Sequence, residues 1–221
     1  MHLQVRRPGH GAGPPLKVGI LGGAFNPPHL GHLICAQEAL LRLELDRVLL
    51  VPFGEPPHRE LVDDPGAEAR FEMCSLAASE SPVLEASRLE IDRRGPSYTV
   101  DTLSGLRDAA TEDSHFLILG GDQLAALPSW REPERVLELA TVAGVPRGEY
   151  TRERIERDLG SLPGAFAVRF FEMPAVEVSS TLVRARAARG EPIRYLVPDS
   201  VVDYISDRGL YGASATVGAD R

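Results

Sequence analysis

The chain has 221 residues, with 24 basic and 32 acidic side chains and a formal net charge of −8. This acidic balance argues against binding to a nucleic-acid polymer, but it leaves room for a small phosphate site with local positive potential. No apolar run approaches the ~20 residues of a membrane helix, and residues 1–15 lack the apolar centre of a secretory signal. With Cys35 and Cys74 as its only cysteines, the chain is expected to be cytoplasmic with unpaired structural thiols.

Apolar runs alternate with amphipathic stretches from residue 16 to residue 212, which predicts one folded domain between a disordered extension (1–15) and a flexible tail (213–221). Strands are expected at 18–21, 48–52, 83–86, 116–119, 141–145 and 168–171, and helices at 29–42, 67–79, 98–109, 133–139, 151–159, 180–189 and 199–208. This order predicts an α/β fold with a Rossmann-like, doubly wound parallel sheet. Ligands then bind beyond the carboxyl ends of the strands.

The loop after the first strand reads Gly22-Gly23-Ala24-Phe25-Asn26-Pro27-Pro28-His29-Leu30-Gly31-His32. His29 and His32 are three residues apart at the start of a helix, so both imidazoles share a face beside unpaired N–H groups and a positive dipole end. Gly31 leaves room for a ligand to approach the backbone. We therefore predict a nucleotide-phosphate site. Two alternatives are a plain turn with surface histidines and a zinc site built from His29, His32, His58 and Cys35.

A rigid Pro56-Pro57-His58-Arg59 segment follows the second strand. Its imidazole and guanidinium would clamp a triphosphate, although a proline-stiffened exposed loop explains the same residues.

Ser97 is a reasonable N-cap for the helix at 98–109. After the fourth strand, Asp122 is placed to accept a hydrogen bond from a ribose hydroxyl. Trp130, the single tryptophan, packs in the core or stacks on a flat ring.

The last motif is Ser179-Ser180-Thr181-Leu182-Val183-Arg184. Ser179 or Ser180 would cap a helix whose N–H groups face an anion, and Arg184 lies one turn along on the side of Ser180. A capped amphipathic helix with a solvated Arg184 is the simpler interpretation.

The segment 22–32 resembles the signature of the nucleotidyltransferase superfamily that carries a His-x-Gly-His motif. The usual form has Thr and Asp where this chain has Ala24 and Asn26. Asn26 keeps a side chain that can cap the loop, whereas Ala24 lacks a hydroxyl that could bond the nucleotide. Because the backbone amides remain, we expect nucleotide binding to be maintained. Ser97-Tyr98-Thr99 followed by Asp101-Thr102-Leu103, and Asp122 with Trp130 eight residues later, resemble one branch, the bacterial nicotinate-mononucleotide adenylyltransferases. The resemblance spans residues 17–211.

This resemblance implies transfer of AMP from ATP to nicotinic acid mononucleotide, with Mg²⁺ carried by the ATP and no dedicated protein cage for the metal. The resemblance does not decide whether the chain forms a homo-oligomer, and it implies no membrane or nucleic-acid partner. Sister enzymes that use nicotinamide mononucleotide, phosphopantetheine or a CTP-dependent alcohol phosphate are alternatives, and the 97–103 segment and Trp130 argue against the last two. The family often has Arg-Pro-Gly where this chain reads Val145-Pro146-Arg147-Gly148.

The implied site residues fall into three groups. The catalytic residues are His29, His32 and Arg59. The ATP-binding residues are Gly22, Gly23, Ala24, Phe25, His29, Gly31, His32, His58, Arg59, Asp122, Ser179, Ser180, Thr181 and Arg184. The mononucleotide-binding residues are Asn26, Tyr98, Thr99, Asp122, Trp130 and Arg147.

Overall fold

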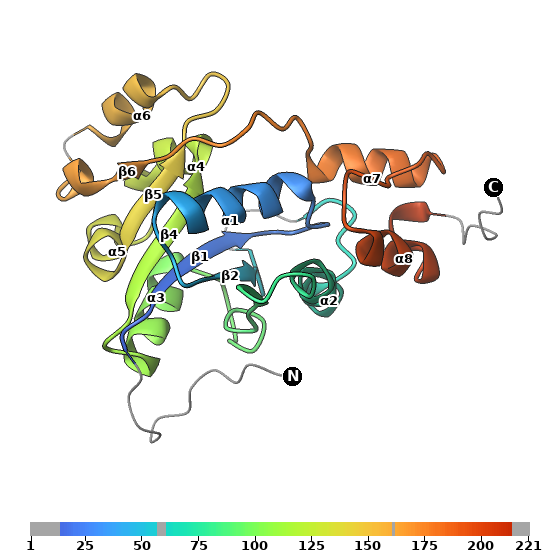
Figure 1. The fold of residues 1–221 in the computed structure, drawn as a ribbon, viewed down its shortest axis with the longest axis horizontal. Coiled ribbons are helices and arrows are strands. Elements are labelled where there is room, and N and C mark those ends of the chain that lie inside the picture. The colour runs from blue at the N-terminus through green and yellow to red at the C-terminus, as the bar shows by residue number, and fades with distance from the viewer. Residues whose placement is uncertain (1–13, 57–60, 161, 214–221) are drawn as a thin grey trace. The chain divides into compact units, whose positions relative to one another are not determined.

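The computed structural model describes residues 14–56, 61–160 and 162–213 (Figure 1). Its strands are β1 (Lys17–Gly23), β2 (Arg47–Pro52), β3 (Leu84–Ala86), β4 (Ser114–Gly120), β5 (Thr141–Val145) and β6 (Arg169–Phe170). They form one sheet in the order β3-β2-β1-β4-β5-β6, and β4 runs parallel to both β1 and β5. The strand order reverses between β1 and β4, as in doubly wound folds. The predicted Rossmann-like α/β fold is therefore confirmed.

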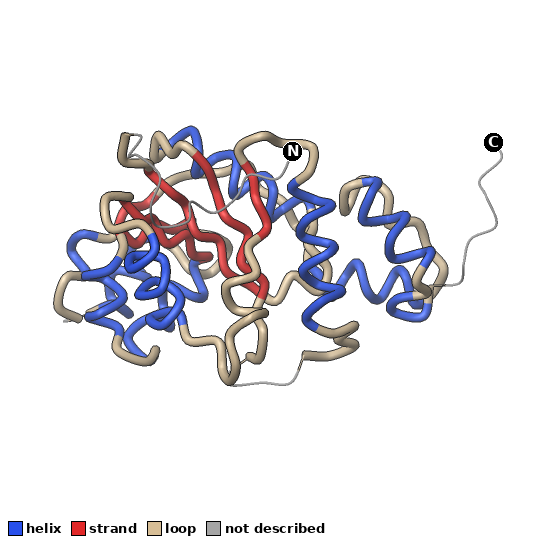
Figure 2. The backbone as a smooth tube through the Cα atoms, turned by 90° about the horizontal axis from the view of Figure 1, so that it is seen from below, coloured by secondary structure: helices blue, strands red, loops and turns tan. Residues whose placement is uncertain are grey.

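The helices are α1 (Leu30–Arg42), α2 (Ala67–Ala78), α3 (Thr99–Ala109), α4 (Gly121–Ala126), α5 (Pro133–Leu139), α6 (Arg152–Leu159), α7 (Ser180–Ala188) and α8 (Asp199–Asp207). The described residues also contain three short 3-10 turns: η1 (Leu127–Ser129), η2 (Ala165–Ala167) and η3 (Leu210–Gly212). Figure 2 shows the helices in blue and the strands in red along the backbone. Each predicted strand and helix is present, with ends that agree to within two residues. Helix α4 was not predicted. No helix in the described ranges is long and apolar enough to cross a membrane.

The chain divides into two compact units. Unit 1 comprises Met1–Leu21, Glu38–Val48 and Ser97–Met173, and contains β4 with most of β1. Val18, Ile20, Leu117 and Ile118 are almost fully buried in it, because strands covered on both faces carry apolar side chains in succession. The predicted single domain over 16–212 stays a prediction, and most of the two predicted terminal segments lies outside the described residues.

Unit 2 comprises Gly22–Gln37, Leu49–Pro96 and Pro174–Arg221. In this unit α2 packs against α8 and α7 packs against η3 (Figure 1). The buried cluster that joins them is made of small and medium apolar side chains: Met73, Ala77, Val183, Ala187, Ile193, Val197, Val201 and Ile205. Cys74 lies beside this cluster on α2, and burial raises the pKa of its thiol. Neither cysteine forms a disulfide; Cys74 is buried and Cys35 half-buried.

Candidate active site

The loop after β1 turns sharply around a buried aromatic residue. The backbone N–H of Phe53 donates to the carbonyl of Gly23 at 3.0 Å, which holds the ends of β1 and β2 together. Phe25 is 1% exposed and has a φ of 48°, in the left-handed region that bulky residues rarely adopt. Such a conformation costs ~1–3 kcal/mol and persists only where the surroundings enforce it, as they often do at ligand sites.

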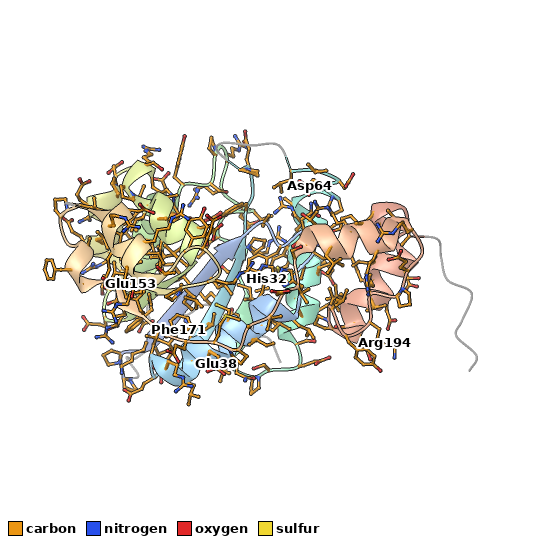
Figure 3. All side chains as sticks on the ribbon, turned by 90° about the horizontal axis from the view of Figure 1, so that it is seen from above. His32, Glu38, Asp64, Glu153, Phe171 and Arg194 are labelled. Carbon is orange, nitrogen blue, oxygen red and sulfur yellow. The ribbon has the colours of Figure 1, made fainter. Side chains whose placement is uncertain are left out.

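The two predicted catalytic histidines stack on each other at the start of α1. Their ring centroids are 3.7 Å apart with 26° between the planes, and Phe25 meets the ring of His32 edge-on at 4.9 Å. The backbone N–H of His29 donates to Nδ1 of His32 at 3.1 Å. Because Nδ1 accepts this bond, Nε2 is the ring nitrogen that can carry a proton and donate. Figure 3 labels His32 in this position.

Gly31 lies close to the ring of His29, with little room for a side chain. A Cβ at this position would lie 3.0 Å from the ring of His29, closer than ordinary contact. In the same turn the N–H of Leu30 donates to the carbonyl of Leu196, and the N–H of His32 donates to the carbonyl of His29, both at 2.9 Å. Among the described residues the N–H of Gly31 has no acceptor, so it is the backbone donor that this turn offers to an anion.

Carbonyl groups of the loop are held by side chains from α2 and α7. Arg70, only 1% exposed, donates to the carbonyl of Ala24 at 3.2 Å. Its guanidinium also donates to the carbonyls of Phe53 at 2.6 Å and Gly54 at 3.2 Å, and it pairs with Asp64 at 2.9 Å. One buried cation therefore fixes the loops that follow β1 and β2. Asp64 is labelled in Figure 3.

The start of α7 is capped as the sequence predicts. The hydroxyl of Ser179 accepts from the N–H of Leu182 at 3.2 Å. Ser180 and Arg184, one turn apart, both reach the loop after β1: Ser180 Oγ donates to the carbonyl of Pro27, and Arg184 Nη1 donates to the carbonyl of Asn26, each at 2.8 Å. The shared face of these two residues is thus confirmed.

Arg184 is not the solvated side chain of the simpler interpretation, because its side chain is only 12% exposed. Its Nε lies 3.7 Å from a carboxylate oxygen of Asp63 and has no hydrogen-bond acceptor among the described residues. The guanidinium therefore brings a positive charge with spare donors to the side of the loop.

In unit 1 the segment at Trp130 approaches the start of α3. The guanidinium of Arg131 lies over the ring of Tyr98 at 4.8 Å and 3.6 Å from a carboxylate oxygen of Asp101. The predicted N-cap at Ser97 is wrong: α3 begins at Thr99, and Tyr98 occupies the N-cap position without a side-chain capping bond. Trp130 is half-buried, so part of its ring remains accessible.

Asp122 and Arg147 are both exposed, on neighbouring segments of unit 1. Asp122 is the second residue of α4, and Arg147 begins a tight turn closed by reciprocal backbone bonds to Tyr150 at 3.1 and 3.0 Å. A Cβ at Gly121 would lie 2.7 Å from Cβ of Tyr150, so only glycine lets the turn pack on the start of α4. The start of α4 and the turn at Arg147 are therefore adjacent.

A model of the cytidylyltransferase-like family matches residues 20–186. This chain belongs to that family. Relatives described as "probable nicotinate-nucleotide adenylyltransferase" include one from Corynebacterium kroppenstedtii, 43% identical over 92% of this chain and 94% of its own, and one from Roseiflexus sp., 45% identical over 88% and 97%. They place the chain in the nicotinate-nucleotide adenylyltransferase branch of the family.

Solved structures share the fold of this family member. The Plasmodium falciparum nicotinic acid mononucleotide adenylyltransferase complexed with NaAD aligns with a TM-score of 0.73, covering 91% of this chain and all of its own at 17% identity. A solved structure from Vibrio parahaemolyticus aligns with a TM-score of 0.62 at 19% identity, over 90% of this chain and 98% of its own. At these identities the likeness shows the fold alone.

Two of the predicted site residues, His58 and Arg59, lie outside the described residues. Over the ranges that the structure describes, no group of three or more His, Cys, Asp or Glu side chains is arranged to hold a metal ion, so the zinc alternative has no support there. Arg70 and Tyr211 contact the loop of this adenylyltransferase-family chain, yet no motif predicts them. Their one signal is composition: Arg70 interrupts an otherwise apolar face, and Gly209 and Gly212 flank the segment of Tyr211.

Proposed function

We propose that this protein transfers the AMP group of ATP to nicotinic acid mononucleotide, releasing pyrophosphate and forming nicotinic acid adenine dinucleotide for NAD biosynthesis. Membership of the nicotinate-nucleotide adenylyltransferase branch supports this assignment. The observation that carries it in the structure is the pair His29 and His32, stacked at a helix start beside an available backbone N–H. That arrangement offers hydrogen-bond donors to a phosphate and holds no group that must form a covalent intermediate.

In the proposed reaction a phosphate oxygen of the mononucleotide attacks the α-phosphorus of ATP in line. The new P–O bond forms as the bond to the bridging oxygen of the pyrophosphate breaks, and the electron pair leaves with pyrophosphate. Catalysis then consists of positioning the two phosphates and stabilising the charge on their oxygens. His32 is suited to this role because the His29 N–H fixes its Nδ1 and leaves Nε2–H as the ring's donor.

The leaving pyrophosphate would be bound by α7 and the loop after β2. Support comes from the guanidinium of Arg184 and from the first N–H groups of α7, at Ser180 and Thr181, which have no intrahelical acceptor. The hydroxyl of Ser180 is committed to Pro27, so we propose its backbone N–H as the contact. We propose that His58 and Arg59 contact the pyrophosphate from the loop after β2. Gly22, Gly23, Ala24 and Phe25 are proposed to line the ATP site.

Mg²⁺ would enter with ATP, held by phosphate oxygens. The ion neutralises charge on the phosphates when bound. The protein's own contribution is the placement of Arg184 and the two histidines around them.

On the mononucleotide side we propose contacts from Tyr98, Thr99, Trp130 and Arg147, with Asp122 accepting from a ribose hydroxyl. The half-buried ring of Trp130 is suited to stacking on the pyridine, and Arg147 is exposed in its turn. A sister enzyme that prefers nicotinamide mononucleotide would share all these contacts, so the choice of the acid rests on the relatives.

Pyrophosphate release with ATP and each mononucleotide in parallel tests the proposal. We expect turnover with nicotinic acid mononucleotide to exceed turnover with the amide, and His32→Ala to abolish most of both rates. Preference for the amide would overturn the substrate assignment, and no release with either would overturn the activity. Thermal shift with ATP and with the dinucleotide product provides an independent readout, because a ligand that binds the folded state raises its apparent stability.

A further inference from the structure

We propose that Tyr211 is a positioning residue for the adenylyl transfer, acting through Asn26 to hold the loop that carries His29 and His32. The proposal rests on the proposed function. It also gives Asn26 a different task from the mononucleotide contact that the motif implies. The evidence is the set of hydrogen bonds around Asn26, the state of the Tyr211 hydroxyl and the backbone that presents it.

The amide of Asn26 is already occupied by protein partners. Asn26 is 3% exposed; its Nδ2 donates to the carbonyl of Val62 at 2.9 Å and its Oδ1 accepts from the hydroxyl of Tyr211 at 2.7 Å. Its main-chain carbonyl accepts from Arg184. A side chain so enclosed offers little to a ligand, so its function is to join three segments of unit 2 to the loop. It lies three residues before His29.

The direction of the Tyr211 hydrogen bond is fixed by its surroundings. Because Nδ2 of Asn26 faces a carbonyl, Oδ1 must be the atom near Tyr211, and the phenol must donate. Burial raises the pKa of Tyr211, so the phenol keeps the proton that it donates. The phenol is therefore protonated and able to donate at neutral pH.

The backbone at Tyr211 is held in an uncommon conformation. Its φ is 59°, and the flanking glycines Gly209 and Gly212 have φ values of 58° and 75°. A left-handed conformation at a bulky residue persists only where other contacts compensate for it. Here η3 packs on α7, and the hydroxyl reaches Asn26 in the same unit. The turn thus serves to aim the phenol at the loop.

Loss of this hydrogen bond leaves a buried acceptor unpaired, which lowers stability without unfolding the protein, and loop placement has a strong effect on rate. Asn26 connects on one side to Arg184 and on the other to the turn that stacks His29 on His32. Without the Tyr211 hydroxyl, Oδ1 of Asn26 is buried without its donor, and the loop shifts to find another. The expected consequence is a lower kcat with a nearly unchanged fold.

The test is Tyr211→Phe, assayed by pyrophosphate release over a range of ATP concentrations. We expect kcat to fall ~10-fold or more, because small misplacements of catalytic groups cost rate, while KM for ATP changes much less. The matched control is Tyr195→Phe, which removes the same hydroxyl from a tyrosine that is 81% exposed and has a φ of 67°. Its kcat should equal that of the wild type. An unchanged kcat in Tyr211→Phe would overturn the proposal.

A double-mutant cycle separates positioning from general destabilisation. If Tyr211 acts through Asn26, adding Tyr211→Phe to Asn26→Ala should lower kcat no further than Asn26→Ala alone. Independent, multiplicative losses would overturn the proposal. Amide hydrogen exchange of residues 22–33 in the single variant Tyr211→Phe does not depend on activity: faster exchange there than in Tyr195→Phe supports the role, and equal exchange refutes it. Failure of the proposed function would appear separately, as a wild-type protein without pyrophosphate release.

Discussion

Replacing Arg70 with methionine should destabilise the protein more than any substitution of an exposed arginine. Methionine approximates the volume of the arginine stem but donates nothing, so the carbonyls of Ala24, Phe53 and Gly54 lose their donor at once. The arginine is 1% exposed, so water cannot easily replace it. Arg70→Lys should lie between methionine and wild type, because one ammonium cannot reach three carbonyls.

The magnitude follows from these partners. A buried acceptor left unpaired costs ~1–3 kcal/mol, and removing one member of a buried ion pair costs ~3–5 kcal/mol. Asp64 is 28% exposed, so water can solvate it and its share is smaller. Since the three carbonyls can relax together, we expect a total loss of ~3–5 kcal/mol, a large part of the ~5–15 kcal/mol that stabilises a typical protein.

Urea unfolding of Arg70→Met measures this loss directly. The matched control is Arg88→Met, since Arg88 also pairs with carboxylates, those of Glu68 and Asp92, but its side chain is 40% exposed. Exposed ion pairs contribute little, so the control should unfold close to the wild type. Because Arg70 holds the two loops proposed to bind ATP, its variant should also lose the thermal shift given by ATP. A loss below about 1 kcal/mol, or one equal to that of the control, would refute the reasoning.

His32→Ala should lower kcat ~10²–10³-fold, as loss of an oxyanion donor does, and near-normal pyrophosphate release would remove His32 from the mechanism. Gly31→Ala places a Cβ 3.0 Å from the ring of His29 and should lower kcat, whereas Gly105→Ala, a helical position with open space around it, should leave kcat unchanged. Burial lowers the pKa of His115 from its ordinary 6.5, so the unfolded chain binds its proton first and stability is lost as the pH falls from about 6.5 through the lowered pKa. Urea midpoints from pH 5 to 8 should therefore fall less steeply on the acid side in His115→Gln, and parallel profiles would contradict this.

The fold was predictable because its strands are short apolar runs between amphipathic segments. Helix α4 was missed because Gly120, Gly121 and Asp122 indicate a turn, and the helix that follows has only six residues. The cap at Ser97 was assigned one position too early, since serine is a good N-cap wherever the helix begins nearby. Local propensity decides such boundaries weakly, and packing around the helix start overrides it.

The site was predictable only where neighbouring residues act together. His29, Gly31 and His32 form a local motif, and the spacing of Ser180 and Arg184 correctly placed both on one face. Arg70 and Tyr211 are distant from the loop in sequence, and their partners are backbone carbonyls or a single amide, which leave no pattern. The arginine on the apolar face of α2 and the glycines around Tyr211 are unusual in composition, but they do not show which segments these residues contact.

The contacts that fix the loop after β1 also bear on how the protein folds. Ser180, Arg184 and Tyr211 meet residues 153, 158 and 185 positions earlier in the chain. Contacts of such separation close large loops, and they form late because the closure entropy is lost before the contacts compensate for it. During synthesis, β1 and α1 emerge long before α7 and η3. The loop after β1, which we propose binds phosphate, is thus expected to be the last part of the molecule to take its final shape, so a nascent or partly folded chain would not yet bind ATP there.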